Sequence, residues 1–180
     1  MSTKEKSETV VEEPVSSEPR EMKQEIKFRK ATVHDTMQMK ELVKMFHKEF
    51  LDDLGFSMED LLFKKIAATE VLASTWVACL PDRMEEDELI HGKVVGMFSG
   101  YYTTYILNND KMFHEIVWYV HPDYRNCGMA LYKHCAEQVK LSGAKKMVMI
   151  TMATDIGDSL EKTYTKMGFT KLETHYVKEL

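Results

Sequence analysis

Residues 115–134 read Glu115-Ile-Val-Trp-Tyr-Val120-His-Pro-Asp-Tyr-Arg125-Asn-Cys-Gly128-Met-Ala130-Leu-Tyr-Lys-His134. An apolar run rich in β-branched and aromatic residues predicts a strand that stops at Pro122, and a helical pattern begins near Gly128. The start of a helix offers unpaired backbone N–H groups and the positive end of the helix dipole. This junction therefore predicts an anion-binding cradle suited to a pyrophosphate.

The residues of the connecting loop fit the same interpretation. Arg125 adds a positive charge beside the helix start. Gly128 has no Cβ to keep an oxygen away from the backbone. We expect the anion to be held by the backbone N–H groups of Asn126, Cys127, Gly128, Met129 and Ala130. The alternative is an ordinary strand-to-helix turn that is capped by solvent.

Two motifs resemble those of the GNAT N-acetyltransferases. Arg125-Asn-Cys-Gly128-Met-Ala130 is similar to the R/Q-x-x-G-x-G/A loop that holds the acyl-CoA pyrophosphate in that family. Its lead-in from Val120 is similar to the family's V-x-P-x-x-R. Tyr164-Thr-Lys-Met-Gly168-Phe169 is similar to the Y-x-x-x-G-F signature that closes the family's last helix. The resemblance spans residues 26–177 and implies an acetyl-CoA-dependent enzyme.

The hydrophobic pattern predicts an α/β fold, a GNAT-like mixed central sheet of about six strands flanked by about four helices. Residues 1–25 are acidic and aperiodic, so we expect a disordered tail, with the acetyltransferase domain spanning 26–180. The acidic segment 81–92 is expected to be a long hairpin loop. Strands are expected at 26–30, 75–80, 93–99, 113–120, 146–151 and 169–177, and helices near 39–50, 57–67, 128–142 and 158–167.

Composition narrows the class of protein. At 180 residues the chain has the length of one domain with a sizeable core. No apolar run approaches the ~20 residues of a membrane helix, and we expect no membrane partner. Three cysteines without a C-x-x-C argue against a disulfide framework and favour the cytoplasm. The net charge of −5 disfavours a nucleic-acid partner.

Acyl transfer to an amine needs a base for the amine and an acid for the leaving thiolate. Glu115 lies ten residues before Arg125, where the histone-acetyltransferase branch of the family carries its catalytic glutamate. Apolar neighbours would raise the pKa of this carboxyl toward that of a useful base. The alternatives are a surface glutamate at this position, or His114 as the base from the opposite face of the strand.

The resemblance assigns two further groups. It makes Tyr164 the general acid, for which a buried tyrosine bonded to a carbonyl is the alternative. It makes the backbone N–H of Val120 the donor that polarises the carbonyl. Cys127 as a nucleophile lacks a partner base, and the scattered histidines lack ligand spacing, so we expect no metal.

These features predict an acyltransferase that moves an acetyl group from acetyl-CoA to a primary amine by direct attack in a ternary complex. The acceptor, a small molecule or a protein, stays open, as does the choice between a monomer and a homodimer. The alternative is a catalytically inactive GNAT-fold module that binds acyl-CoA or another protein. Gly157, where many family members carry Asn, and the short C-terminus fit that alternative.

Overall fold

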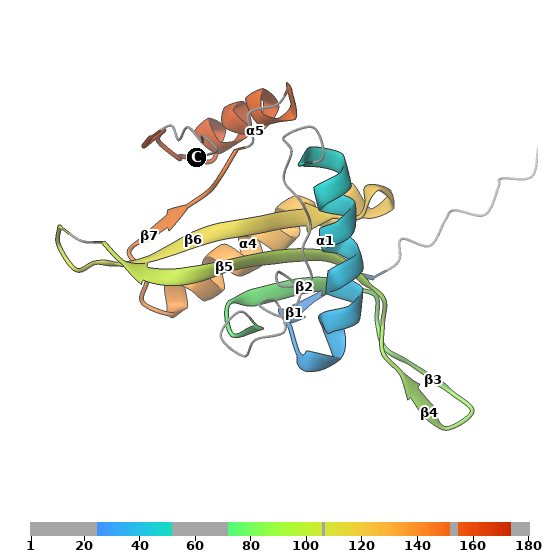
Figure 1. Ribbon diagram of the computed structural model, residues 1–180. Helices are drawn as coiled ribbons and strands as arrows, with labels where there is room; N and C mark the ends of the chain where they lie inside the picture. Colours follow the sequence, from blue (N-terminus) through green and yellow to red (C-terminus); the bar gives the residue numbers. More distant parts are fainter. Residues whose placement is uncertain (1–24, 52–71, 106, 152–154, 174–180) are drawn as a thin grey trace, which may run out of the picture.

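The computed structural model describes residues 25–51, 72–105, 107–151 and 155–173 (Figure 1). Five strands form one sheet in the order β1-β2-β5-β6-β7. Neighbouring strands are antiparallel except β6 and β7, which are parallel. The bounds of the strands are β1 (Lys27–Lys30), β2 (Thr75–Cys79), β5 (Val94–Thr104), β6 (Lys111–Val120) and β7 (Lys146–Val148).

Two helices cover the two faces of this sheet. Helix α1 (Thr36–Phe50), preceded by the 3-10 turn η1 (Val33–Asp35), packs on one face, and α4 (Gly128–Leu141) packs on the other (Figure 1). The buried residues of each helix recur at three- to four-residue spacing, which puts them on one side of the helix. They are Met39, Leu42 and Val43 in α1, and Leu131, Cys135 and Val139 in α4.

The mixed α/β architecture is the predicted one, and the end of α4 is confirmed. The helix stops at Leu141, and Gly143 adopts a left-handed φ of 85°. Helix α5 (Asp155–Lys166) begins three residues earlier than predicted. Residues 169–173 lie in no strand. The expected tail at 1–25, apart from its last residue, and the expected helix at 57–67 fall on residues outside the described ranges, as does the remainder of the expected last strand.

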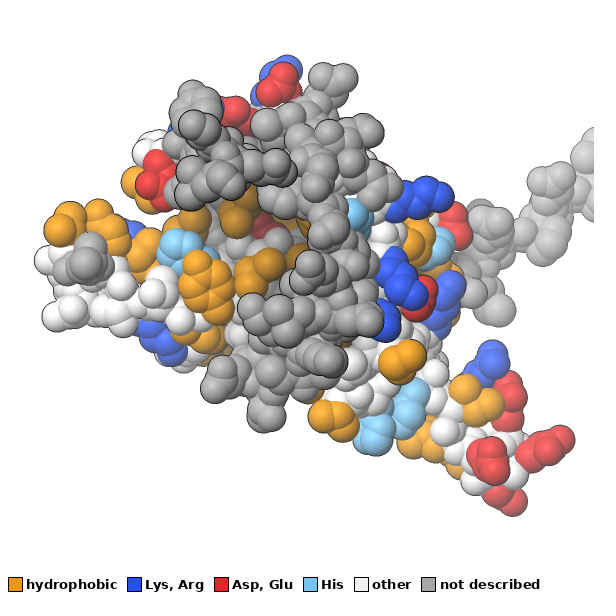
Figure 2. All heavy atoms as spheres, in the orientation of Figure 1, with side chains coloured by type: hydrophobic (Ala, Val, Ile, Leu, Met, Phe, Trp, Pro, Cys, Tyr) orange, Lys and Arg blue, Asp and Glu red, His pale blue; other side chains and the backbone are white. Residues whose placement is uncertain are grey.

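The segment predicted as a long acidic hairpin loop does join two antiparallel neighbours, β2 and β5, but it also contains a second, two-stranded sheet that was not predicted. Strands β3 (Arg83–Glu85) and β4 (Glu88–Ile90) pair antiparallel and project from the body (Figure 1). Glu86 and Asp87 join them with φ of 48° and 68°, the two consecutive left-handed residues of a tight hairpin turn. Acidic side chains gather at its tip (Figure 2). The Glu-Asp pair is not the Asn-Gly or Asp-Gly signal that announces such turns.

Strand β6 carries a β-bulge at Ile116. Ser99 of β5 faces Val117 of β6. The next residue of β5, Gly100, faces Glu115, so Ile116 is an extra residue in the ladder. A bulge bends its strand and re-aims the neighbouring side chains. This bulge therefore sets the direction of the Glu115 side chain.

Candidate active site

Glu115 lies where β6 and β7 part. The two strands pair only at residues 112–114 of β6, which face 146–148 of β7. Immediately beyond, Glu115 Oε2 accepts a hydrogen bond of 3.0 Å from the backbone N–H of Ile150. A side chain thus takes the N–H that the neighbouring strand would otherwise bind. This explains why β7 ends at Val148 and not at the predicted residue 151.

Burial sets the proton affinity of the Glu115 carboxyl. Only 4% of the residue is exposed. This burial raises the pKa to about 7, although the Ile150 N–H favours the charged form. Both protonation states are then populated near neutral pH, which suits a general base. His114, the rival base, points elsewhere and stacks on the ring of Tyr101 at 5.3 Å between centroids.

Tyr164 of α5 meets Glu115 at the backbone of Ile150. Its hydroxyl donates a hydrogen bond of 3.3 Å to the Ile150 carbonyl oxygen. Burial raises the pKa of Tyr164 above its usual value, and the charge of Glu115 raises it further. The hydroxyl therefore keeps its proton at neutral pH. The two side chains predicted for catalysis, from β6 and α5, are thus brought to the same backbone group.

The Y-x-x-x-G-F pattern forms the C-terminal cap of α5. Gly168 has φ of 89°, and its N–H bonds to the Thr165 carbonyl. The N–H of Phe169 bonds to the Tyr164 carbonyl at 3.0 Å. These two bonds define a Schellman motif, in which the residue after the glycine packs on the helix. The rings of Phe169 and Tyr164 are accordingly 5.6 Å apart, which fixes the tyrosine against the end of the helix.

The backbone N–H of Val120 faces the edge of β6 from which β7 has separated. His121 donates its N–H to Val95 of β5 at 2.8 Å. Successive N–H groups of an antiparallel strand point to opposite edges, so that of Val120 points away from β5. On that side β7 pairs with β6 only at residues 112–114. The donor predicted to polarise a carbonyl thus points, like the contact of Glu115 with Ile150, to the edge of β6 beyond the residues that pair with β7.

The predicted anion cradle is a helical junction without a loop. The 3-10 helix η3 (Pro122–Cys127) runs directly into α4, and the N–H of Gly128 bonds to the Arg125 carbonyl. Among the remaining cradle residues, Cys127 is buried, while Asn126, Met129 and Ala130 are exposed. Backbone N–H groups at the positive end of a 14-residue helix are donors of the kind an anion needs. The Gly128 amide is already engaged inside the chain, so it is not among the donors left for an anion.

At two residues of the cradle, Gly128 and Cys127, the structure bears on what the sequence suggested. A Cβ at Gly128 would lie 3.7 Å from Val120 and 3.9 Å from Trp118, which is ordinary contact, so folding alone does not require glycine there. Burial raises the pKa of the Cys127 thiol, the opposite of what a nucleophile needs. The carboxylate that pairs with Arg125, that of Glu49, was not predicted from the sequence either.

Arg125 extends away from the cradle to a glutamate of α1. Its Nη2 lies 2.7 Å from each carboxylate oxygen of Glu49. The hydroxyl of Tyr119 donates to the same carboxylate at 2.9 Å. Glu49 and Arg125 are 76 residues apart, and no local spacing in the sequence could have indicated the pair. Glu49 is thus a site residue that only the fold reveals.

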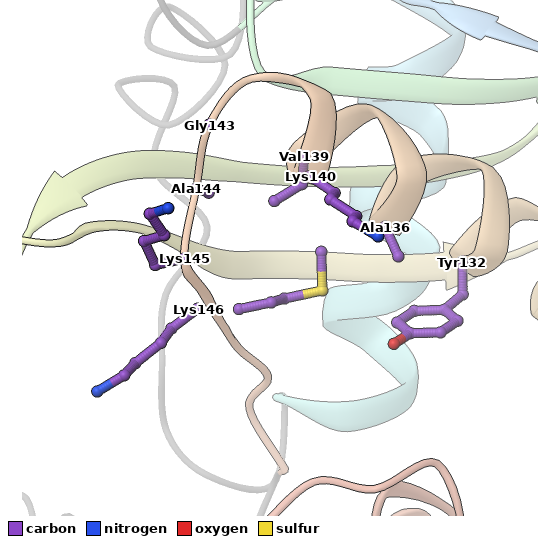
Figure 3. Close-up of a pocket in the computed structure, with 9 residues that line it drawn as sticks. Tyr132, Ala136, Val139, Lys140, Gly143, Ala144, Lys145 and Lys146 are labelled. Atoms are coloured by element: carbon purple, nitrogen blue, oxygen red, sulfur yellow. The ribbon is translucent and has the colours of Figure 1, made fainter.

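A separate pocket of about 510 Å³ lies at the other end of α4 (Figure 3). It is lined by Tyr132, Ala136, Val139 and Lys140 of α4 and by residues 143–147. From Gly128 to Val139 the helix rises by roughly 16 Å. The pocket is therefore distinct from the junction of η3 and α4.

Within the described ranges, no three His, Cys, Asp or Glu side chains gather as metal ligands do. None of the helices in this part of the chain is both long and apolar enough to span a bilayer.

Solved structures share this fold at low identity. An acetyltransferase from Trypanosoma brucei is 20% identical over 87% of this chain and 100% of its own, with a TM-score of 0.60. An aminoglycoside acetyltransferase from an uncultured soil metagenomic sample, in complex with sisomicin, is 15% identical over 86% of this chain and 96% of its own, with a TM-score of 0.61. A ribosomal-protein-alanine N-acetyltransferase from Brucella melitensis is 14% identical over 87% and 99%, with a TM-score of 0.59.

Comparisons of sequence give the family. No curated protein matches the chain. The model of the Acetyltransferase (GNAT) family matches residues 39–169, which include β6, η3, α4 and the capped end of α5. This range is well over half of the 180 residues. The chain therefore belongs to the GNAT acetyltransferase family.

Proposed function

We propose that the protein transfers an acetyl group from acetyl-CoA to a primary amine by direct attack in a ternary complex. One observation carries the proposal. A buried carboxyl with a pKa of about 7 and a protonated tyrosine meet at the backbone of Ile150, beside the opening between β6 and β7. A base and an acid at one opening in the sheet are the groups that acyl transfer to an amine requires.

Backbone N–H groups at two places would bind acetyl-CoA and polarise its carbonyl. Backbone N–H groups between Asn126 and Ala130, other than that of Gly128, would hold the diphosphate of coenzyme A. Acetyl-CoA, when bound, supplies an activated thioester. The N–H of Val120 would donate to the carbonyl oxygen and stabilise the charge that develops there.

Proton transfers complete the proposed reaction. The Glu115 carboxylate would accept a proton from the ammonium form of the acceptor, directly or through one water, and leave a nucleophilic amine. The Tyr164 hydroxyl would give a proton to the leaving thiolate and regain one from the nitrogen, which loses its second proton as the amide forms. The raised pKa values suit these roles, because Glu115 can take a proton near neutral pH and Tyr164 starts with one. The acceptor is an amine, of a small molecule or of a protein.

The test is the substitution Glu115→Gln. It preserves the shape of the side chain and removes the base, so we expect kcat to fall by about 10² or more at neutral pH. Affinity for coenzyme A, measured by calorimetry, should remain that of the wild type. The assay detects free thiol from acetyl-CoA across a panel of amines.

Controls separate catalysis from folding and from simple binding. Glu88→Gln changes an exposed carboxylate of the β3–β4 hairpin and should leave kcat unchanged. Wild-type turnover by Glu115→Gln would remove Glu115 from the mechanism. Binding of acetyl-CoA by the wild type without thiol release for any amine would favour the inactive module.

A further inference from the structure

The side chain of Arg125 lies in a three-residue cluster that joins three elements. Its guanidinium forms two contacts of 2.7 Å with the Glu49 carboxylate of α1. Tyr119 of β6 donates its hydroxyl to that carboxylate at 2.9 Å, and its ring centroid lies 5.3 Å from the guanidinium carbon. The carboxylate is therefore bound by two donors, and the arginine by a charge and an aromatic ring. Such charge-assisted bonds hold both side chains in one geometry.

This cluster lies on the α1 side of the sheet. Tyr119 belongs to the core cluster under α1, where its ring meets Phe46 and Phe50 edge-on. The start of α4 packs on the opposite side, where Cys127 belongs to the other core cluster. The Arg125 side chain therefore turns away from the amides that would hold a diphosphate. Its charge is balanced by Glu49 in this arrangement.

We propose that Glu49 is a positioning residue for the coenzyme A loop, and that Arg125 acts as a strut to Glu49 and not as a ligand of the diphosphate. The inference rests on the proposed function. In its favour, η3 is only six residues long, contains Asn126 and Cys127 of the cradle and leads directly into the start of α4. The ion pair ties this short element to α1, a 15-residue helix packed on the sheet. Fixing η3 fixes the direction of the amides that follow it.

The experiment measures the Kd of coenzyme A by calorimetry on the full chain. We expect Glu49→Gln and Arg125→Gln each to weaken binding by a similar factor, roughly 5- to 10-fold. The double variant should bind no more weakly than either single one, because both remove the same interaction. The exchanged pair, Glu49→Arg with Arg125→Glu, should recover part of the affinity. Glu41→Gln removes an exposed ion pair of the same helix, with Lys44, and should leave the Kd unchanged.

A model in which Arg125 binds the diphosphate predicts that the two single variants change the Kd in opposite directions. If Arg125 binds the diphosphate and Glu49 merely competes for it, Glu49→Gln will tighten binding while Arg125→Gln weakens it, and that result overturns the inference. An unchanged Kd in both single variants overturns it as well. Salt provides a readout that folding does not affect. The loss of affinity with rising ionic strength should be equal in the wild type and Arg125→Gln, because the missing charge does not face the anion.

Failure of the proposed function gives a different result from failure of this inference. Wild-type protein that does not bind coenzyme A at all overturns the proposed function and the role of Glu49 together. Wild-type protein that binds, with single variants of opposite sign, overturns the role of Glu49 alone. In steady-state kinetics Glu49→Gln should raise the KM for acetyl-CoA with little change in kcat. Glu115→Gln should instead lower kcat with little change in that KM.

Discussion

Glu115 is a carboxyl group enclosed by the protein at the one point where its strand loses a neighbour. Burial disfavours the charged form, and a single backbone N–H from Ile150 compensates only in part. The result is a carboxyl whose pKa of about 7 lies well above its usual 4.5. Such a shift is a property of folding as well as of catalysis, since the unfolded chain releases the same proton at a lower pH.

The shift predicts how stability depends on pH. Between the two pKa values the folded state binds more protons than the unfolded state, so the free energy of unfolding falls as pH rises through that window. Glu115→Gln lacks this dependence. Its stability relative to the wild type should therefore increase by about 3 kcal/mol from about pH 4 to about pH 8. Urea denaturation at a series of pH values measures this difference, and parallel curves for the two proteins would show that the shift is absent.

Glycine occupies two positions near the site, one in β5 and one at the start of α4, for different physical reasons. Gly100 faces the β6 bulge, where a Cβ would lie 2.2 Å from the carbonyl oxygen of His114 and 2.4 Å from the ring of Phe113. Gly128 begins α4 with helical φ and ψ, and its Cβ would meet only ordinary contacts. The first glycine is required by the sheet. Among the described residues no close contact requires the second glycine, and we expect the approach of a ligand to be its reason.

A pair of alanine substitutions tests this distinction. Gly100→Ala should destabilise the protein by about 1–3 kcal/mol or more, because backbone atoms must shift to admit the methyl group. Gly128→Ala should be neutral or stabilising by about 0.5–1 kcal/mol, since alanine favours a helix over glycine. Denaturant midpoints measure both. A large loss of stability in Gly128→Ala would show that packing, and not a ligand, accounts for that glycine.

A larger side chain at the same place tests the cradle itself. Gly128→Glu puts a negative charge beside the amides expected to hold a diphosphate, so it should weaken the affinity for coenzyme A. The repulsion and the added bulk both act against the anion. Calorimetry on folded protein measures the loss. Unchanged affinity would place the diphosphate somewhere other than the start of α4.

At the scale of the whole molecule, one opening in the sheet organises the site. Strands β6 and β7 are paired at one end and diverge toward the other (Figure 1). Helix α4 starts just beyond the end of β6, and the capped end of α5 brings Tyr164 to the chain that leaves β7. Helices α1 and α4 pack on the two faces of the sheet and hold β6 in place on either side of the point where β7 leaves it.

Ligand binding to this opening should stabilise the entire fold. Coenzyme A at a hundredfold excess over its Kd should add about 2.7 kcal/mol to the free energy of unfolding. For a domain of this size the midpoint of thermal unfolding should rise by several degrees. Differential scanning fluorimetry with coenzyme A and with a matched nucleotide that lacks the diphosphate measures the rise. Equal curves with and without coenzyme A would contradict the proposed cosubstrate.

The sequence alone determined the features that arise from neighbouring residues. The strand before Pro122, the helix after Gly128 and its end at Gly143 follow from apolar periodicity and from turn residues. The Tyr164-to-Phe169 pattern likewise marks a helix cap, because its hydrogen bonds join residues within one turn. Local patterns also indicated that Glu115 lies on a strand, and the resemblance to the family was carried by the same stretches.

Only the tertiary structure decided what those residues touch. The bulge at Ile116, the bond between Glu115 and Ile150 and the pairing of Arg125 with Glu49 each join parts of the chain that are distant in sequence. The acidic turn of the hairpin escaped prediction because its first central residue, Glu86, is of a type that rarely takes up left-handed φ. Spacing fixes which side of an element a side chain occupies. The partner on that side depends on how the strands diverge and where the helices pack, which no local pattern encodes.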